Sequence, residues 1–368
     1  MRVVLAAGQY AEWPGPLAAS ERLAAGWARH APDDQVILAP VSDGGSGFVE
    51  VLAHALDAQP TPVVVSGPSG QEVPAQFLLH NDTTYVEAGQ AAGRHLAPDV
   101  LEAVAAPPEG GAAAAVTALS ALTSRGVGEL INAALDTGAS RIVLGCGDLA
   151  SHDGGVGLLQ ALGAGEDLAD LPAARQRLAG TTLVLAAATE LPLTGFHGAS
   201  AALGTEHGVP PEVTQRLEET LGLLTERVNR ILPQRKDLLT GQRIRPERTD
   251  GAGVGGGVGY AAILLGAQPV VGARFVIEEI GLADVLPGAL VVTGGVAYDW
   301  QSVHDGVIAE VARAALEVGA PSIVLAERVE VGRREGMSLG ISGAYDPRQG
   351  EDLAGLAERV ARTWSPRR

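Results

Sequence analysis

Two loops of the sequence place an aspartate and several glycines directly after an apolar run. SDGGSG occupies 42–47 and SHDGGVG occupies 151–157. Glycines in such a loop let backbone N–H groups converge on one point and let a ligand approach the main chain closely. An aspartate there suits a magnesium ion that bridges phosphate oxygens, or a hydroxyl that must lose its proton. Asp43 and Asp153 are therefore candidate metal or substrate ligands, and the alternative is that each closes a turn as an N-cap.

Two further segments offer hydrogen-bond donors for an anion. Thr123 and Ser124 precede an expected helix, where they either cap its N-terminus or hold a carboxylate or phosphate. GAGVGGGVG at 251–259 contains the G-x-G-x-x-G spacing, but the residues before it do not form the strand that a dinucleotide-binding fold requires. This turn is therefore expected to lead into a helix N-terminus, where it either cradles a phosphate or carboxylate or packs the helix closely against a neighbour.

The composition excludes several classes of function. Lys and Arg number 26 against 43 Asp and Glu, and the net charge of -17 argues against non-specific binding to nucleic acid. Lys236 is the single lysine, so a phosphate loop ending in Gly-Lys-Ser/Thr is absent, and a polyphosphate must be held by backbone amides, helix N-termini, arginines or a metal. Cys146 is the single cysteine, which excludes an internal disulfide. Beside a strand end it is expected to be a small, half-buried residue, and the alternative is a nucleophile.

The apolar segments are too short for a membrane helix or a secretion signal. The N-terminal apolar run is brief, and elsewhere no run of about 18 apolar residues lacks a charge or a turn signal. We therefore expect a cytoplasmic protein with small-molecule partners and no binding to nucleic acid or membrane. The alanine-rich helices allow packing within one chain or between two, so a homodimer is an open alternative.

The elements expected from hydrophobic periodicity alternate between strand and helix at both ends of the chain. Near the N-terminus, strands at 2–7 and 36–41 alternate with helices at 16–31 and 47–57, as in a parallel sheet. Three runs between 61 and 89 are separated by turns instead, which favours antiparallel strands and a change of domain near residue 67. The sequence therefore predicts two α/β domains, the second inserted in the first. The other expected elements are strands at 141–145, 181–188, 288–295 and 322–327 and helices at 126–138, 210–235, 303–318 and 351–364.

Five motifs follow one another along the chain. They are PVSDGGSG at 40–47, TSRGVGEL at 123–130, GCGDLASHDGGVGLLQALG at 145–163, GAGVGGGVG at 251–259 and TGGVAYDWQS at 293–302. In order and spacing they resemble the type I glycerate kinases over nearly the whole chain, and the resemblance is weakest between 165 and 245. It implies a flavodoxin-like, Rossmann-like parallel-sheet domain at 1–67 and 285–368, with a second α/β domain inserted at 68–284.

The resemblance also implies an activity, which is transfer of the ATP γ-phosphoryl group to a hydroxyl of glycerate with Mg²⁺. Such a transfer depends mainly on positioning and charge neutralisation. Asp43, Asp153 and Asp299 are the implied catalytic residues: the first two match family aspartates that would serve magnesium or substrate, and Asp299 would be the base for the glycerate hydroxyl. The implied substrate- or phosphate-binding residues are Gly44, Gly45, Thr123, Ser124, Gly126, Gly154, Gly155, Gly253, Gly256 and Gly294.

Three segments differ from the family pattern at charged positions. GQYAEWPG at 8–15 stands where Asp-Ser-Phe-Lys-Gly is usual, and ATELPL at 188–193 stands in place of Asp-Val-Thr-Asn-Pro-Leu. Gly295, Ala297 and Gly306 replace a glutamate, an arginine and a lysine in and after the late motif. The motifs that remain are mostly glycines and turns, which a binding protein would also need.

Three hypotheses therefore stay open. The first is an active glycerate kinase in which Arg125, Arg243 or Arg245 replaces the missing lysines. The second is a catalytically inactive member that binds a nucleotide or a small hydroxy acid as a sensor or regulatory protein. The third is a scaffold that presents a surface, such as the charged face of the helix at 210–235, to a partner.

Overall fold

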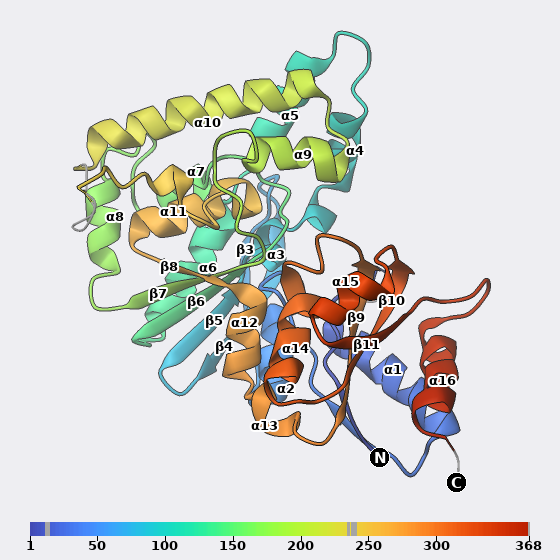
Figure 1. Ribbon diagram of the computed structural model, residues 1–368. Helices are drawn as coiled ribbons and strands as arrows, with labels where there is room; N and C mark the ends of the chain where they lie inside the picture. Colours follow the sequence, from blue (N-terminus) through green and yellow to red (C-terminus); the bar gives the residue numbers. More distant parts are fainter. Residues whose placement is uncertain (12–14, 234–235, 237–240, 367–368) are drawn as a thin grey trace. The chain divides into compact units, whose positions relative to one another are not determined.

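The computed structural model describes residues 1–11, 15–233, 236 and 241–366 (Figure 1). The chain forms two compact units, a discontinuous one of Met1–Ala58 with Gly272–Arg368 and a continuous one of Gln59–Val271. The predicted α/β class with parallel sheets is confirmed. The sequence places the boundaries near residues 67 and 285, and the structure places them earlier. One reason is that the strand at Thr61–Ser66 pairs with the next strand of the continuous unit.

The discontinuous unit contains a five-stranded sheet in the order β11-β10-β9-β1-β2, and every neighbouring pair is parallel. When the strands are numbered along this unit alone, their order in the sheet from β2 to β11 is 2-1-3-4-5. That is the flavodoxin-like order, as the resemblance implies. The strands are β1 (Arg2–Leu5), β2 (Gln35–Leu38), β9 (Leu290–Tyr298), β10 (Ser322–Val329) and β11 (Ile341–Tyr345).

Helices cover both faces of this sheet. On one face, Trp27 of α1 and Leu356 of α16 share a buried core with Leu5 of β1. On the other face, Ile308 of α14 packs with Val324 of β10. The helices of this unit are α1 (Pro16–His30), α2 (Phe48–Ala55), α12 (Gly272–Glu279), α13 (Leu282–Val285), α14 (Gly306–Glu317), α15 (Arg333–Ser338) and α16 (Leu353–Trp364).

The continuous unit contains a six-stranded mixed sheet in the order β3-β4-β5-β6-β7-β8. The first three strands pair antiparallel, as their turn-linked sequence predicts, and β5 to β8 pair parallel. The loops after β6 and β7 therefore leave the sheet at the same edge. The strands are β3 (Thr61–Ser66), β4 (Glu72–His80), β5 (Thr83–Glu87), β6 (Arg141–Cys146), β7 (Thr182–Ala187) and β8 (Gln268–Val271).

The helices of the continuous unit enclose its main hydrophobic core. The longest, α10, buries Val213, Leu217, Leu221 and Val228 along one face, which confirms the predicted amphipathic helix. It ends at Ile231, and residues 234–235 of the predicted range lie outside the described residues. The helices are α3 (Ala88–Ala92), α4 (Pro98–Ala105), α5 (Ala112–Ser120), α6 (Arg125–Asp136), α7 (Val156–Ala161), α8 (Leu171–Arg177), α9 (Ala199–His207), α10 (Pro211–Ile231) and α11 (Val258–Leu265), with short 3-10 turns at Arg94–Leu96, Pro246–Arg248 and Val254–Gly257.

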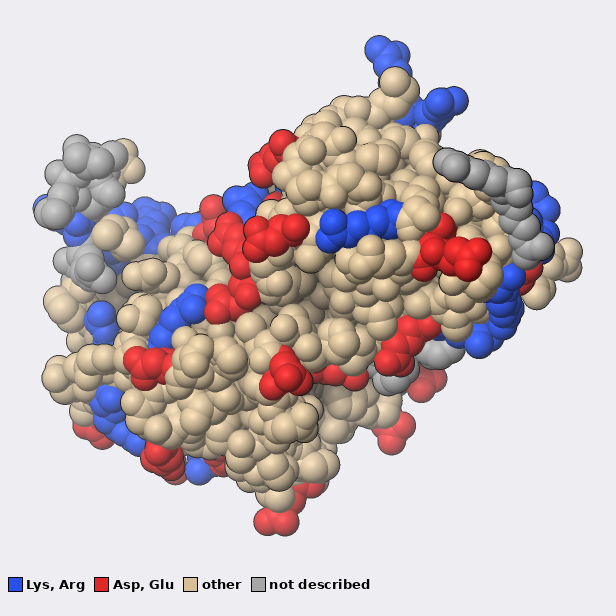
Figure 2. Space-filling model, turned by 90° about the horizontal axis from the view of Figure 1, so that it is seen from below, with Lys and Arg blue, Asp and Glu red and all other residues tan. Residues whose placement is uncertain are grey.

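The surface carries charges of both signs. On the face drawn in Figure 2, acidic side chains lie between basic ones, and the full sequence has the larger number of acids. None of the helices in the described part of the chain combines the length and hydropathy needed to span a bilayer.

Candidate active site

The sheet of the discontinuous unit reverses its order between β1 and β9, and ligands of doubly wound folds bind at the carboxyl ends of such strands. Just after β1, Gly8 donates its N–H to the carbonyl oxygen of Gly294 in β9 at 2.9 Å. The altered segments 8–15 and 293–302 therefore meet at this point, and residues 12–14 lie outside the described residues. A Cβ on Gly294 would overlap the carbonyl oxygen of Leu325, so close packing already requires this glycine.

Asp43 lies in the turn between β2 and α2. Its Oδ1 accepts a hydrogen bond from the N–H of Gly45 at 2.9 Å, and the N–H of Gly44 donates to Ser42 Oγ at 3.2 Å. Burial raises the pKa of the Asp43 carboxyl, the Gly45 hydrogen bond partly offsets this rise, and the charge of Asp305 adds to it. A carboxylate has about four lone-pair sites, so the bonds from Gly45 and from its own backbone N–H leave Asp43 with capacity for a metal ion or a substrate hydroxyl.

Asp299 follows β9 and is held by the turn that begins there. Its Oδ1 accepts a hydrogen bond from the N–H of Ser302 at 2.9 Å, and Ser302 Oγ accepts one from the N–H of Asp299 at 2.8 Å. This reciprocal pair fixes the carboxyl group at the strand end. The neighbouring Trp300 is 75% exposed, so its ring is not part of the core.

Asp153 has a different environment in the loop between β6 and α7. Its Oδ2 accepts hydrogen bonds from both the N–H and the hydroxyl of Ser124 and from the N–H of Gly157, all at 2.9 to 3.0 Å. Its Oδ1 accepts one from the N–H of Gly155 at 2.9 Å. The carboxylate therefore joins the N-terminal ends of α6 and α7, and most of its acceptor capacity is used within the protein.

Ser124 does not cap α6 with its side chain, which corrects the N-cap alternative from the sequence. Its hydroxyl donates to Asp153 and accepts a hydrogen bond from the N–H of Leu158 at 3.0 Å. Thr123 Oγ1 instead accepts from the N–H of Arg125 at 3.1 Å. The reason is that α7 begins beside α6 and the Ser124 side chain joins the two helix ends. Ser124 is fully buried, so its hydroxyl has little freedom to reach a ligand.

Several glycines predicted to bind phosphate lie where the chain packs against itself. A Cβ on Gly126 would overlap the carbonyl oxygen of Ser66, and one on Gly253 would overlap that of Pro192. Gly256 faces the carbonyl oxygen of Ser151, while Gly154 and Gly155 have positive φ angles and pack against side chains of α10 and α11. Close packing thus explains these glycines without a ligand, as the packing alternative for the 251–259 turn predicts.

Replacement of Gly126 by alanine is expected to lower the free energy of unfolding by about 1–3 kcal/mol, because the methyl group overlaps a backbone oxygen that cannot move alone. Urea unfolding without ligands measures the effect. Gly222→Ala in α10 is the matched control: a Cβ there meets no atom within 4 Å, and alanine is the better helix former by about 1 kcal/mol. Equal stabilities for the two variants would contradict the packing explanation.

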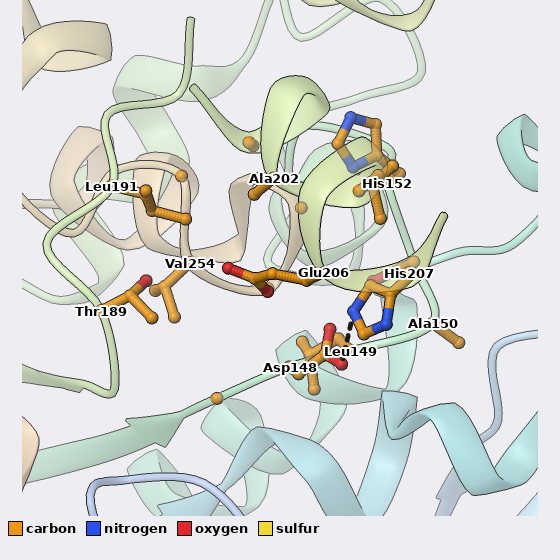
Figure 3. A pocket seen from close by; sticks show the side chains of 17 residues that line it. Asp148, Leu149, Ala150, His152, Thr189, Leu191, Ala202, Glu206, His207 and Val254 are labelled. Atoms are coloured by element: carbon orange, nitrogen blue, oxygen red, sulfur yellow. Dashed lines mark ion pairs between the residues drawn. The ribbon is translucent and has the colours of Figure 1, made fainter. Parts of the chain in front are cut away.

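A pocket lies at the carboxyl ends of β6 and β7, and we call it the β6–β7 pocket (Figure 3). It brings the predicted residues Gly253 and Gly256 together with residues that the sequence did not single out. Its lining comes from the loop after β6, the loop after β7, α9 and the glycine turn, and comprises Gly147, Asp148, Leu149, Ala150, Ser151, His152, Thr189, Leu191, Ala199, Ala202, Leu203, Glu206, His207, Gly253, Val254, Gly255 and Gly256.

Charged side chains gather at one side of this pocket. Asp148 Oδ2 lies 3.0 Å from His207 Nε2 and 3.4 Å from Nε of Arg94. Burial and then the charge of Asp148 raise the pKa of Glu206, while His207 and Arg94 lower it. Asp148 follows β6 directly, and polar residues directly after a parallel strand are the signal by which the sequence could have revealed it.

Cys146 and His152, next to the pocket and in its lining, are both buried. The thiol of Cys146 is fully buried and burial raises its pKa, which excludes the nucleophile alternative; the residue is also more buried than the sequence suggested. His152 is 5% exposed, and its Nε2 lies 3.0 Å from Ser200 Oγ. Burial lowers the pKa of His152 to about 4, so its ring is neutral at neutral pH.

Replacement of His152 by glutamine is expected to reduce the acid sensitivity of the fold. Between pH 6.5 and about 4 the unfolded chain binds a proton at His152 that the native chain does not, so stability is lost as pH falls through this window. The slope from this one group is at most about 1.4 kcal/mol per pH unit. Urea unfolding at pH 7 and pH 5 should show a flatter dependence for His152→Gln, and an unchanged one for the exposed His95→Gln. A slope unaltered in His152→Gln would refute this origin.

The arginines proposed to replace lysines lie in two places of the continuous unit. Arg125 forms an ion pair with Glu129 one turn along α6, with Nε and Oε1 3.1 Å apart. Arg243 and Arg245 line an open recess together with Arg248. Among the described residues, no group of three or more His, Cys, Asp or Glu side chains is arranged to hold a metal ion. Asp153 Oδ2 accepts three hydrogen bonds within the protein and its Oδ1 accepts one.

These features match one family of proteins over nearly the whole chain. The model described as the glycerate kinase family matches residues 3–359. The chain belongs to the glycerate kinase family.

Named relatives support this family assignment. An uncharacterized protein of Mycobacterium bovis is 35% identical over 98% of this chain and 91% of its own length. The glycerate kinase of Bacillus subtilis is 31% identical over 89% of this chain and 85% of its own length. A crystal structure named as glycerate kinase 2 from Salmonella typhimurium LT2 has a TM-score of 0.70 and 27% identity, and covers 99% of this chain and 98% of its own. Family membership makes this chain a kinase-type protein whose relatives include glycerate kinases.

Proposed function

We propose that the protein transfers the γ-phosphoryl group of ATP to a hydroxyl of glycerate. The observation that carries the proposal is the Asp43 turn, since this family motif keeps a half-buried carboxylate with free acceptor capacity at the carboxyl end of β2. A buried carboxylate with a raised pKa is unfavourable for the fold, and such groups gather at functional sites. The family match over residues 3–359 gives the reaction class.

Each residue has a separate role in the proposed reaction. Asp43 would hold Mg²⁺, which neutralises charge on the phosphate oxygens when it is bound. Asp299, held by Ser302, would accept the proton of the glycerate hydroxyl. Asp153 would position the ends of α6 and α7. The arginines at 125, 243 and 245 are the available cations for phosphate or carboxylate, because the chain has a single lysine.

Release of ADP in the presence of D-glycerate and MgATP tests the proposal directly. We expect glycerate-dependent turnover in the wild-type protein and a loss of about 100-fold or more in Asp299→Asn. Asp33→Asn, at an exposed carboxylate of the same unit, is the matched control and should keep full activity. Thermal stabilisation by ATP or glycerate without turnover would favour the inactive, ligand-binding member, and no ligand effect at all would favour the scaffold. A cytoplasmic location and a homodimer stay predictions.

A further inference from the structure

The β6–β7 pocket is acidic. Asp148 and Glu206 both present carboxylates to it, and none of the described residues that line it is a lysine or an arginine. Arg94 reaches Asp148 from outside this lining. A phosphate or a carboxylate placed beside these two acids would be repelled, and the low dielectric of a pocket strengthens that repulsion. The two carboxylates therefore disfavour the triphosphate of a nucleotide and the carboxylate of glycerate at this place, while Arg94 and His207 offset part of their charge.

Hydroxyl groups in the same pocket lack partners. Ser151 is 1% exposed, and its Oγ has no hydrogen-bond partner in the described part of the chain. The buried Oγ1 of Thr189 has none there either. Buried polar atoms in proteins are nearly always hydrogen-bonded. The pocket therefore offers hydroxyl partners to a ligand that carries hydroxyls of its own.

The two carboxylates can accept further hydrogen bonds, and the opposite side of the pocket is apolar. Both ion pairs of Asp148 use Oδ2, which leaves Oδ1 available. In Figure 3, Asp148 lies beside His207, Leu191 and Val254 lie at the other side near Thr189, and the Glu206 carboxylate points into the space between the two groups. An ionised carboxylate only accepts hydrogen bonds, so the matching ligand is an uncharged group with neighbouring hydroxyls and an apolar part.

We propose that the β6–β7 pocket binds the vicinal diol of an uncharged group, with Asp148 and Glu206 accepting hydrogen bonds from its hydroxyls. A ribose is one source of such a diol, and acidic residues bind ribose hydroxyls in other nucleotide sites. In that case the base lies against Leu191 and Val254, and the assignment rests on the proposed function. A polyol without a carboxylate is the other source of the same chemistry.

Titration calorimetry with ligands that carry no phosphate tests this site independently of turnover. The probes are adenosine, 2′,3′-dideoxyadenosine, erythritol and D-glycerate. We expect adenosine to bind and the dideoxy analogue to bind at least 10-fold more weakly. Glu206→Gln should weaken adenosine binding about 10-fold and Ser151→Ala severalfold, while Glu219→Gln on the exposed face of α10 leaves it unchanged.

Each outcome either supports or contradicts a diol site in the β6–β7 pocket. Binding of erythritol but not adenosine would support the diol site and assign it to an uncharged polyol. Three results would overturn the proposal. They are equal binding of adenosine and its dideoxy analogue, weaker glycerate binding in Glu206→Gln, and no binding of adenosine or erythritol to the wild-type protein. Glycerate-dependent ADP release with no diol binding would leave the kinase function standing without this site. Adenosine binding without ADP release would support this site and leave the kinase function unsupported.

Discussion

Replacement of Asp153 by alanine is expected to lower the free energy of unfolding by about 3–5 kcal/mol in the absence of any ligand. The carboxylate accepts four hydrogen bonds, from the N–H and hydroxyl of Ser124 and from the N–H groups of Gly155 and Gly157. Removal of the acceptor leaves these largely buried donors unsatisfied, and each such loss costs about 1–3 kcal/mol before relaxation. Urea unfolding by circular dichroism measures the change.

The same experiment separates a structural role of Asp153 from a metal-binding one. If the Asp153 carboxylate served only to bind magnesium, its replacement would leave the free energy of unfolding of the metal-free protein unchanged or would raise it. Ser124→Ala should reproduce part of the loss, and the double variant should lose less than the sum, because both residues act in one network. Asp136→Ala, at the exposed end of α6, is the control and should change little. A stable Asp153→Ala protein would contradict the structural assignment.

Replacement of Asp43 by asparagine is expected to have the opposite signature: turnover falls by about 100-fold or more, while the fold keeps or gains stability. The amide oxygen can still accept the hydrogen bond from Gly45, so the turn remains. The lost charge removes the proposed magnesium ligand and its share of transition-state stabilisation. Steady-state ADP release and urea unfolding on the same preparations measure both effects.

The sign of the stability change follows from the raised pKa of Asp43. Its pKa in the native chain lies above the ordinary 3.8, so the native chain retains this proton to higher pH than the unfolded one. Stability is then lost as pH rises through the window between the two pKa values, and the cost remains at neutral pH. Asp43→Asn should therefore be at least as stable as the wild-type protein at pH 7, with the difference vanishing below pH 3.8. Lower stability at pH 7 would show that the charge is structural.

The order and type of the elements could be predicted from the sequence because each has a clear local signal. The strand at 141–146 is a short branched apolar run, and α10 repeats apolar residues at helical spacing. The domain boundaries were harder, because the change of connection near residue 67 occurs only after β3 has already entered the second sheet. Pairing partners distant in sequence decide such a boundary, and no local pattern records them.

The candidate site could be predicted only in part for the same reason. The two Asp-Gly-Gly loops look alike in sequence, yet Asp153 meets Ser124 from another helix and Asp43 has no such partner among its recorded hydrogen bonds. The β6–β7 pocket depends on α9, which carries Glu206 and His207 and lies far along the chain from Asp148. Motif matching identified the loops, and long-range packing determines which of their carboxylates is free to bind.

The central place of β1 in its sheet has a consequence for synthesis of the chain. β1 pairs with β2 on one side and with β9 on the other, so one of its edges has no partner until β9, at Leu290–Tyr298, has left the ribosome. The continuous unit, by contrast, contains all partners of its own sheet between Gln59 and Val271. We therefore expect it to fold first, while the N-terminal segment waits with an open strand edge, the state in which a nascent chain is most exposed to aggregation.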